Sequence, residues 1–371
     1  ASSAAAARTR ELHGDERVLH FGKGHSIRAG GDFFVFDFLQ HTAGPGYSVA
    51  NNDTIITADS MVRHFCPISV FTAMNNALND LFLMGVSESL VVLPVYDGEP
   101  DEVHSIRAAL ADYRAFFAER GVPLDLRDEG PLGTGAKVIG ATVVGLAKHE
   151  LPGHMGLLPG QEILATRWLG DLSLLSMHRS LHFPYQPHPS LDPVRWKILQ
   201  RFCTPNLLVA GVIRRYLPSL GEAFDPARHV TFSSDVSGPG LFVLEEGARA
   251  SGVDIYIGDM KFIDEKSLGF YRKNQTSSTN GPILLSAMPA VAERLESDLR
   301  AAGLEEVWRL GRVRGKSASP TIFINEELRR RFPSEDPRTD FFAPEVHFGS
   351  GEALHRERAP IFERMEFCAK E

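Results

Sequence analysis

Long apolar runs are missing from this chain of 371 residues. No stretch approaches the roughly 20 apolar residues that a membrane-spanning helix needs, and the first residues contain no hydrophobic secretory segment. We therefore expect a soluble protein with no membrane span. The first ten residues are rich in Ala, Ser and Arg and contain no acid, as in organelle transit peptides. The predicted location is the cytoplasm, with an organelle matrix after transit-peptide removal as the alternative.

Cysteine is scarce, and its placement excludes two classes of site. Cys66, Cys203 and Cys368 lie far apart and outside any CxxC or Cys/His pattern. An odd, widely spaced set of cysteines indicates neither a disulfide framework nor a zinc site. The sequence therefore favours a reducing compartment.

The chain also lacks the basic surplus that is typical of nucleic-acid-binding proteins. Its 39 Lys and Arg residues are outnumbered by 47 Asp and Glu residues, for a formal net charge of -8. Acidic and basic residues are mixed along the chain, so no basic stripe is available to contact phosphodiester backbones. We predict no nucleic-acid partner.

What the sequence does contain is two successive series of strand and helix patterns. The first series predicts strands at 32–40, 53–60, 89–96 and 137–148, with helices at 71–86 and 102–121. The second series predicts strands at 161–170, 253–258, 282–289 and 306–315, a strand leading into a turn at 229–240, and helices at 204–218, 241–252 and 290–303. Two series of this kind predict a two-domain α+β protein.

The predicted boundaries follow from these series. We assign residues 1–25 to an N-terminal tail, 26–155 to the first domain, 156–325 to the second domain, and 326–371 to a C-terminal tail. The C-terminal tail has weak periodicity and many Arg, Glu, Pro and Phe residues. It is predicted to wrap the surface or to bind a partner.

The predicted helix at 71–86 carries an unusual polar stripe. Asn75, Asn76, Asn79 and Asp80 fall together on one side, while apolar residues at helical spacing occupy another. A solvated helix face normally carries Lys and Glu rather than amides with a single carboxylate. The stripe therefore predicts a polar partner against Asp80.

Four aspartates lie where predicted secondary structure changes: Asp32, Asp59, Asp80 and Asp235. Mg²⁺ binds a few carboxylates together with phosphate oxygens and waters, so converging aspartates of this kind would suit a nucleotide-bound metal. The alternative is that each is an ordinary helix cap or turn residue. Spacing alone does not decide between the two interpretations.

Six segments resemble selenophosphate synthetase in their order. They are "TADSMVRHFCP", "NALNDLFLMGV", "GLLPGQEILATRWLG", "SSDVSGPGLFVLEEGARASGVDIYI", "TNGPILLSAMP" and "RLGRV". That enzyme belongs to a superfamily with aminoimidazole ribonucleotide synthetase, thiamine monophosphate kinase and the hydrogenase maturation protein that dehydrates a carbamoyl group. The resemblance extends from about Asp32 to Val313.

The resemblance implies a fold, a cofactor and a set of ligands. The fold is the two-domain aminoimidazole ribonucleotide synthetase type, in which N-terminal strands of two subunits form a shared dimer barrel. Asp59, Asp80 and Asn76 would bind ATP in the first domain, and Asp32, Asp80 and Asp235 would bind Mg²⁺. The implied partners are a small-molecule phosphate acceptor and a second copy of the chain.

Departures from the family pattern concern its catalytic segment. Selenophosphate synthetase has a reactive Cys or selenocysteine beside a Lys in a "GCGCK" segment, but no Cys precedes Cys66 here. The nearest candidate catalytic residue is Lys23 in "HFGKGHSIRAGG", for which a solvated Lys in a flexible glycine loop is the alternative interpretation. Gly31 stands where the family has the first carboxylate of its "DDAAV" strand. A lost thiolate removes a nucleophile, and a lost carboxylate weakens Mg²⁺ binding.

Two hypotheses for function remain open. The first is a selenophosphate synthetase-like, ATP-dependent phosphotransfer enzyme in which Mg²⁺ bridges phosphates and aspartates. The second is a catalytically silent relative that acts as a structural or regulatory subunit of a larger assembly, where a different related chain takes the place of the second copy. Asp59, Asp80 and Asp235 favour the first hypothesis, and the missing Cys/Lys segment favours the second.

Overall fold

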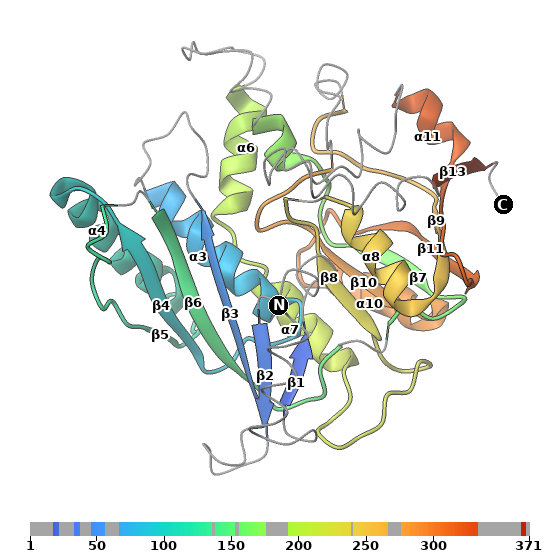
Figure 1. Cartoon of the computed structure of the whole chain (residues 1–371), viewed down its shortest axis with the longest axis horizontal. Helices are drawn as coiled ribbons and strands as arrows, with labels where there is room; N and C mark the ends of the chain where they lie inside the picture. Colours follow the sequence, from blue (N-terminus) through green and yellow to red (C-terminus); the bar gives the residue numbers. More distant parts are fainter. Residues whose placement is uncertain are drawn as a thin grey trace. The chain divides into compact units, whose positions relative to one another are not determined.

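The computed structural model describes residues 18–21, 33–37, 46–55, 67–135, 138–152, 156–175, 192–238, 240–265, 276–332 and 365–368 (Figure 1). The chain divides into two compact units, of which unit 1 comprises 1–151 with 196–223 and unit 2 comprises 152–195 with 224–371. Each unit contains helices and one β-sheet, which confirms the predicted two-domain α+β fold. Among the helices described, none has the length and apolar character needed to cross a bilayer.

Unit 1 is built on a six-stranded sheet with the order β1-β2-β3-β6-β4-β5. The strands are β1 (Val18–Phe21), β2 (Phe33–Asp37), β3 (Tyr47–Ile55), β4 (Leu90–Asp97), β5 (Leu124–Leu126) and β6 (Val138–Ala147). All neighbours are antiparallel except β4 and β5. Helices α3 (Pro67–Phe82) and α4 (Pro100–Ala118) pack against each other, and α3 lies along β3 and β6 (Figure 1).

A close approach between α3 and the sheet depends on one glycine. A Cβ added to Gly145 on β6 would lie 2.5 Å from a methyl of Val86 and 3.0 Å from one of Leu81. Leu81 is completely buried, so this side of the sheet has no room for an extra methyl group. Because Gly145 has no Cβ, α3 can lie directly on β6.

The predicted strand at 53–60 differs from the observed one. Strand β3 begins at Tyr47, within a segment whose Gly, Pro and Asn residues led us to predict a loop. Residues 56–66 lie outside the described part. Asn51 and Asn52 favour turns by local propensity. Here their amides bond to groups distant in sequence, Asn51 to α3 and Asn52 to Thr142 across the strand pair. Tertiary hydrogen bonds therefore override the local turn preference.

Unit 2 contains a seven-stranded sheet with the order β13-β12-β9-β11-β7-β10-β8. Its strands are β7 (Glu162–Ala165), β8 (Phe232–Asp235), β9 (Val253–Ile257), β10 (Ile283–Ala287), β11 (Trp308–Lys316), β12 (Ile322–Asn325) and β13 (Met365–Cys368). Helix α8 (Phe242–Ser251) packs on β9, and α10 (Pro289–Ala301) packs on β7 and β10. The core strands and both helices match the segments predicted from periodicity.

Several elements were not predicted from the sequence. Helix α11 (Glu326–Arg331) and strand β13 both fall in the segment assigned to the C-terminal tail, and β13 pairs in parallel with β12. The side chain of Asn325 caps α11 by accepting the Glu327 N–H at 3.1 Å. Helix α6 (Asp192–Phe202) was also missed. Elements of four to six residues are too short for periodicity to detect, whereas α6 has buried Ile198, Leu199 and Phe202 at helical spacing.

The segment 196–223 packs with unit 1, although the sequence assigned it to the second domain. It contains part of α6, helix α7 (Leu207–Ile213) and the 3₁₀ turn η2 (Arg214–Tyr216). Arg214 forms an ion pair with Glu88, which lowers the pKa of that carboxyl. The N–H of Gly221 donates to Glu150 at 2.8 Å. A domain boundary predicted from the order of the elements alone cannot take such polar contacts into account.

A glycine-rich loop after β5 is anchored on Asp97, the last residue of β4. The Asp97 carboxylate accepts hydrogen bonds from the Thr134 hydroxyl and from the Gly135 N–H, both at 2.8 Å, and also from the Thr134 N–H. The Thr134 hydroxyl bond is the leading cause that holds the pKa of Asp97 at about 2, below the ordinary value of 3.8. The loop is thus tied to the sheet by an ionised carboxylate.

This anchor predicts a particular pH dependence. Because the pKa of Asp97 is lower in the folded protein, its contribution to stability is complete above about pH 4 and is lost as the pH falls toward about 2. Urea unfolding measured from pH 7 to 2 should therefore give a steeper acid loss of stability for the wild type than for Asp97→Asn, which should be less stable at pH 7. Parallel pH profiles would contradict this role.

Candidate functional site

Helix α3 is almost entirely buried, including its polar stripe. Asn75 and Asn79 have no exposed surface, Asp80 is 1% exposed, and Asn76 is half-buried. The predicted amide-rich stripe is therefore not a solvated face. Buried polar side chains need hydrogen-bond partners, so the partners define what the stripe does.

Strand β3 supplies the polar partner that the sequence predicted for Asp80. The Asn51 side chain donates from Nδ2 to Asp80 Oδ2 at 2.7 Å and to the carbonyl oxygen of Ala77 at 3.0 Å. Asn51 is 2% exposed. One amide thus binds both the carboxylate and the backbone of the helix that carries it.

A second amide–carboxylate hydrogen bond joins β3 and α3, this time with the donor on the helix and the acceptor on the strand. Asn76 on α3 donates from Nδ2 to Asp53 Oδ2 on β3 at 2.6 Å. Asn51 and Asp53 are two positions apart on the strand, and Asn76 and Asp80 are four positions apart on the helix, so each pair shares a face. We call Asn51, Asp53, Asn76 and Asp80 the β3–α3 cluster. It presents two carboxylates from adjoining elements, each held by an amide.

The remaining amides of the stripe hold the segment 196–223. Asn75 donates to the carbonyl oxygen of Phe202 at 2.9 Å and accepts from the Tyr113 hydroxyl at 2.8 Å. Asn206 donates from Nδ2 to Asn79 Oδ1 at 2.7 Å. Burial raises the pKa of Tyr113 well above its ordinary value, so its hydroxyl remains a donor. The stripe therefore combines structural contacts at Asn75 and Asn79 with the cluster at Asn76 and Asp80.

Asp235 is the last residue of β8 in unit 2 and is 1% exposed. The segment that follows it is hydrogen-bonded to residues 276–282: Val236 N–H donates to Pro282 O at 2.8 Å, and Leu241 N–H donates to the Thr276 hydroxyl at 2.9 Å. A Cβ on Gly281 would lie 2.1 Å from the carbonyl oxygen of Val236, so this approach requires glycine. Asp235 thus occupies the predicted strand-to-turn position.

Three predicted site residues, Lys23, Asp32 and Asp59, lie outside the described residues. Asp80 and Asn76 are brought into the β3–α3 cluster, and Asp235 belongs to unit 2. Within the described stretches, no group of three or more His, Cys, Asp or Glu side chains is arranged to hold a metal ion. A site built from two carboxylates and ligand oxygens has fewer protein side chains than such a group.

The sequence analysis missed Asn51 and Asp53. A signal was present, because Asn51 and Asp53 alternate with Asn52 in "VANNDTI", as on a strand with one polar face toward a neighbour. This alternation was missed because the sequence analysis assigned Asn51 and Asn52 to a loop. The register of β3 on β6 places Asn51 opposite Val143 and Asp53 opposite Ala141, two residues that face the same buried layer.

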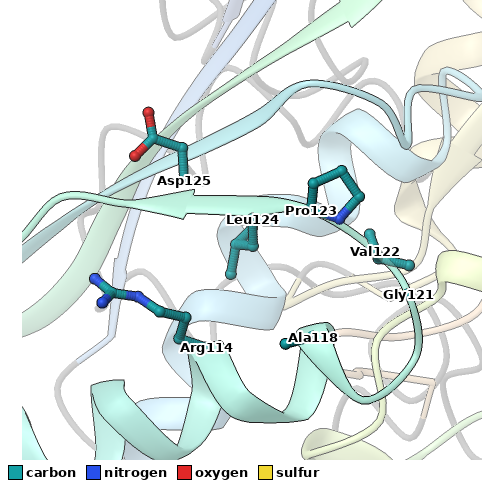
Figure 2. A pocket seen from close by; sticks show the side chains of 7 residues that line it. All are labelled: Arg114, Ala118, Gly121, Val122, Pro123, Leu124 and Asp125. Carbon is teal, nitrogen blue, oxygen red and sulfur yellow. The ribbon is translucent and has the colours of Figure 1, made fainter.

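A separate surface pocket lies between the end of α4 and β5 (Figure 2). Leu124, Val122, Pro123 and Ala118 form most of its lining, with Arg114 and Asp125 at one end. Both charged groups already have partners: Arg114 donates to Leu126 O, and Asp125 accepts from Arg127. The pocket contains no residue of the β3–α3 cluster, so it does not contribute to the candidate site.

No protein-family model and no curated protein sequence matches this chain. Solved structures do match. HypE in the HypE–HypF complex aligns at 16% identity over 86% of this chain and 95% of HypE, with a TM-score of 0.56. HypE in complex with ATP, a hydrogenase maturation protein, aligns at 15% identity over 76% and 83% of the two chains, with a TM-score of 0.53.

Thiamine-monophosphate kinase from Stenotrophomonas maltophilia K279a is similar as well. It aligns at 15% identity over 87% of this chain and 96% of the kinase, with a TM-score of 0.55. At these identities the comparison establishes the fold alone, and the chain has the two-domain fold of these solved structures. The more specific likeness to selenophosphate synthetase stays a prediction.

Proposed function

We propose that this protein is an ATP-dependent phosphotransfer protein that binds Mg·ATP at the β3–α3 cluster. The observation that carries the proposal is the crossed pairing of Asp80 with Asn51 and of Asp53 with Asn76. It presents one carboxylate from each of two adjoining elements, each accepting a hydrogen bond from an amide. HypE in complex with ATP and the thiamine-monophosphate kinase, which share the fold, support a nucleotide as the ligand.

The donor set fits a hard divalent cation. Mg²⁺ is commonly bound through one or two carboxylates together with substrate phosphates, and carboxylate and amide oxygens are the groups that the cluster offers. Asn51 Oδ1 is buried and has no hydrogen-bond partner among the described residues, so the cluster retains an unused acceptor. Asp80 and Asp53 would hold the metal, which would neutralise phosphate charge when bound.

Three further aspartates complete the proposed ligand set. Asp32 directly precedes β2, Asp59 follows the end of β3 by four positions, and Asp235 ends β8. The role of this chain's own residues would be to orient the phosphates and to stabilise negative charge, because phosphoryl transfer depends mostly on positioning and electrostatics. Lys23 is the proposed candidate for a catalytic cation.

The phosphate acceptor is proposed to be a small molecule. Selenide is the acceptor that the sequence resemblance suggests. Gly31, which stands where the resembled family has a carboxylate, favours the second candidate function: a catalytically silent subunit of a larger assembly. HypE, which forms a complex with HypF, is a precedent for assembly on this fold.

Calorimetry on the full chain tests the proposal directly. ATP would be titrated into the protein with Mg²⁺ present, and again with Mg²⁺ replaced by EDTA. We expect binding that depends on Mg²⁺, because ATP phosphates and two carboxylates repel one another without a cation between them. Hydrolysis or transfer assayed on the same sample separates an active enzyme from a silent binder. Absence of any ATP binding would reject both nucleotide-binding versions.

A homodimer formed through unit 1 is part of the proposal. The face of the first sheet opposite α3 carries half-buried apolar side chains on β3, β4 and β6, namely Ala50, Val91, Leu93, Val95, Val144 and Leu146. An apolar sheet face of this kind favours coverage by another layer, and a two-fold partner is the commonest way to provide it. We expect more than about 2,000 Å² to be buried, as in obligate dimers.

The dimer can be tested by light scattering at micromolar protein. The wild type should have twice the mass of one chain, whereas Leu93→Arg should shift the protein toward a monomer because it places a charge in the apolar interface. Asp112→Arg, at an exposed position of α4 away from this face, is the control. A monodisperse wild-type monomer would contradict the homodimer and leave a related chain as the proposed partner.

A further inference from the structure

His149 is a buried histidine of unit 1 that the proposed ATP site does not use. It lies two residues beyond the end of β6 and is 5% exposed. Its ring Nε2 lies 3.0 Å from the carbonyl oxygen of Met84. Because a carbonyl oxygen only accepts hydrogen bonds, Nε2 carries the proton of the neutral ring and Nδ1 is left as an acceptor. Nδ1 is buried and has no hydrogen-bond partner among the described residues.

The carbonyl group of Met84 belongs to the turn that ends α3. Carbonyl groups at the end of a helix have no partner within it, and Met84 is only 4% exposed, so its oxygen needs a donor from elsewhere. The turn closes at Gly85, whose φ of 74° lies in the left-handed region that favours glycine. The His149 ring supplies the missing donor and is thereby fixed against the end of α3.

The segment 214–219 packs against the same turn. A Cβ added to Gly85 would lie 3.0 Å from a methyl of Leu217, 3.2 Å from Nε2 of His149 and 3.5 Å from Cα of Arg214. The end of α3, the His149 ring and the segment 214–219 therefore meet at this glycine.

The backbone of His149 contacts the segment 214–219 as well. His149 forms an isolated antiparallel bridge with Ser219, and the N–H of Glu150 donates to the carbonyl oxygen of Pro218 at 2.9 Å. The side chain of His149 thus binds the end of α3 while its backbone binds the segment 214–219. We call this arrangement the His149 contact.

Charged side chains lie on each element that meets at the His149 contact: Glu88, Lys148, Glu150, Arg214 and Glu222. Glu88 forms ion pairs with Arg214 and with Lys148. The hydrogen bond from Arg214 is the leading cause that lowers the pKa of Glu88, so this carboxylate stays ionised while a histidine titrates.

The pKa of His149 lies below its ordinary value of 6.5. Burial of the ring is the largest cause, and the positive charge of Arg214 acts in the same direction. The hydrogen bond to Met84 and the carboxylates of Glu88 and Glu150 oppose these effects without outweighing them. The closed contact therefore holds the ring in its neutral form.

We propose that protonation of His149 releases the segment 214–219 from the end of α3. A proton on Nδ1 creates a buried N–H without an acceptor and a buried positive charge close to Arg214. Both costs disappear when the contact opens and water reaches the ring. Unit 1 thus contains a pH-sensitive attachment of the segment 214–219, and this inference does not depend on the proposed ATP binding.

The direction of the effect follows from proton binding in the two forms. The opened form, in which the ring is solvated and has its ordinary pKa of 6.5, binds a proton more tightly than the closed form. The contact is therefore complete above about pH 6.5 and weakens as the pH falls below that value. While only the opened form holds the proton, the equilibrium constant for opening rises about tenfold for each unit of pH.

Native-state hydrogen exchange of the full chain, followed by mass spectrometry, measures this opening. Protection factors of peptides covering 145–151 and 214–222 would be compared at about pH 7.5 and about pH 5, with a peptide from α4 of the same unit as the internal reference. A protection factor is the ratio of the intrinsic to the observed exchange rate, so it removes the ordinary pH dependence of exchange.

Two variants separate His149 from other titrating groups. His149→Gln can still donate an N–H to the carbonyl oxygen of Met84, but its side chain does not titrate. His104→Gln is the matched control, because His104 is an exposed histidine of α4 in the same unit.

In the wild type, the protection factors of both peptides should fall at least about fivefold between these two pH values, because the opened ring is protonated over this range and the closed ring is not fully so. His104→Gln should show the same fall. In His149→Gln the protection factors of both peptides should change less than about twofold with pH, as should those of the α4 peptide in every protein.

Wild-type protection factors that do not change with pH would overturn the proposal, and so would a fall of the same size in His149→Gln. An equal fall in the α4 peptide would show that acid weakens unit 1 as a whole, which also overturns it. If His149→Gln does not fold, NMR titration of the His149 ring in the wild type decides the question. A pKa below the ordinary value supports the proposal, and a pKa at or above that value overturns it.

Discussion

Replacing Asp80 with asparagine is expected to reduce Mg²⁺-dependent ATP affinity by at least about 100-fold, or roughly 2.7 kcal/mol. The amide has nearly the same shape as the carboxylate, and its oxygen can still accept the hydrogen bond from Asn51. What is lost is the negative charge that the cation requires. The affinity would be measured by calorimetry, with thermal unfolding to establish that the fold persists.

Two further variants sharpen this prediction. Asp53→Asn should also lower Mg²⁺-dependent ATP affinity. The Asp53 carboxylate accepts a hydrogen bond from Asn76, which lies on the same face of α3 as Asp80. Asp112→Asn is the control, since Asp112 is an exposed residue of α4 outside the cluster. If ATP affinity is unchanged in both Asp80→Asn and Asp53→Asn, the cluster does not bind the metal. The other aspartates would then be its candidate ligands.

Asn75→Ala should have the largest effect on stability, lowering the free energy of unfolding by about 2–4 kcal/mol. The substitution removes the bond to Phe202 O and leaves the completely buried Tyr113 hydroxyl without its acceptor. It also loosens the attachment of the segment 196–223 to α3. Urea unfolding monitored by far-UV circular dichroism would measure the change.

A double-mutant cycle distinguishes the mechanism of this loss. Adding Tyr113→Phe to Asn75→Ala removes the stranded hydroxyl, so the double variant should be less destabilised than the sum of the two single variants. Asn52→Ala is the control, because the exposed Asn52 amide bonds only across the surface and should change stability by less than about 0.5 kcal/mol. Strict additivity would show that the hydrogen bond between Tyr113 and Asn75 contributes little.

The sequence determined the elements that long periodic patterns encode. The helix at 71–86 corresponds to α3, the one at 102–121 to α4, and the one at 290–303 to α10. The strand predicted at 89–96 is β4, and that at 137–148 is β6. These segments are recoverable because one face of each is buried, and burial imposes a periodic choice of apolar residues that can be detected locally. The burial of a polar stripe around Asp80 was recoverable for the same reason.

Only the tertiary structure decided what each member of that stripe contacts. Asn75 and Phe202 are 127 positions apart, as are Asn79 and Asn206, while Asn51 and Asp80 are 29 positions apart. The four amide and acid residues of α3 look alike in the sequence, yet two of them hold a distant segment and two belong to the cluster. A side-chain hydrogen bond depends on which backbone or side chain the fold brings within about 3 Å, and no local pattern contains that information.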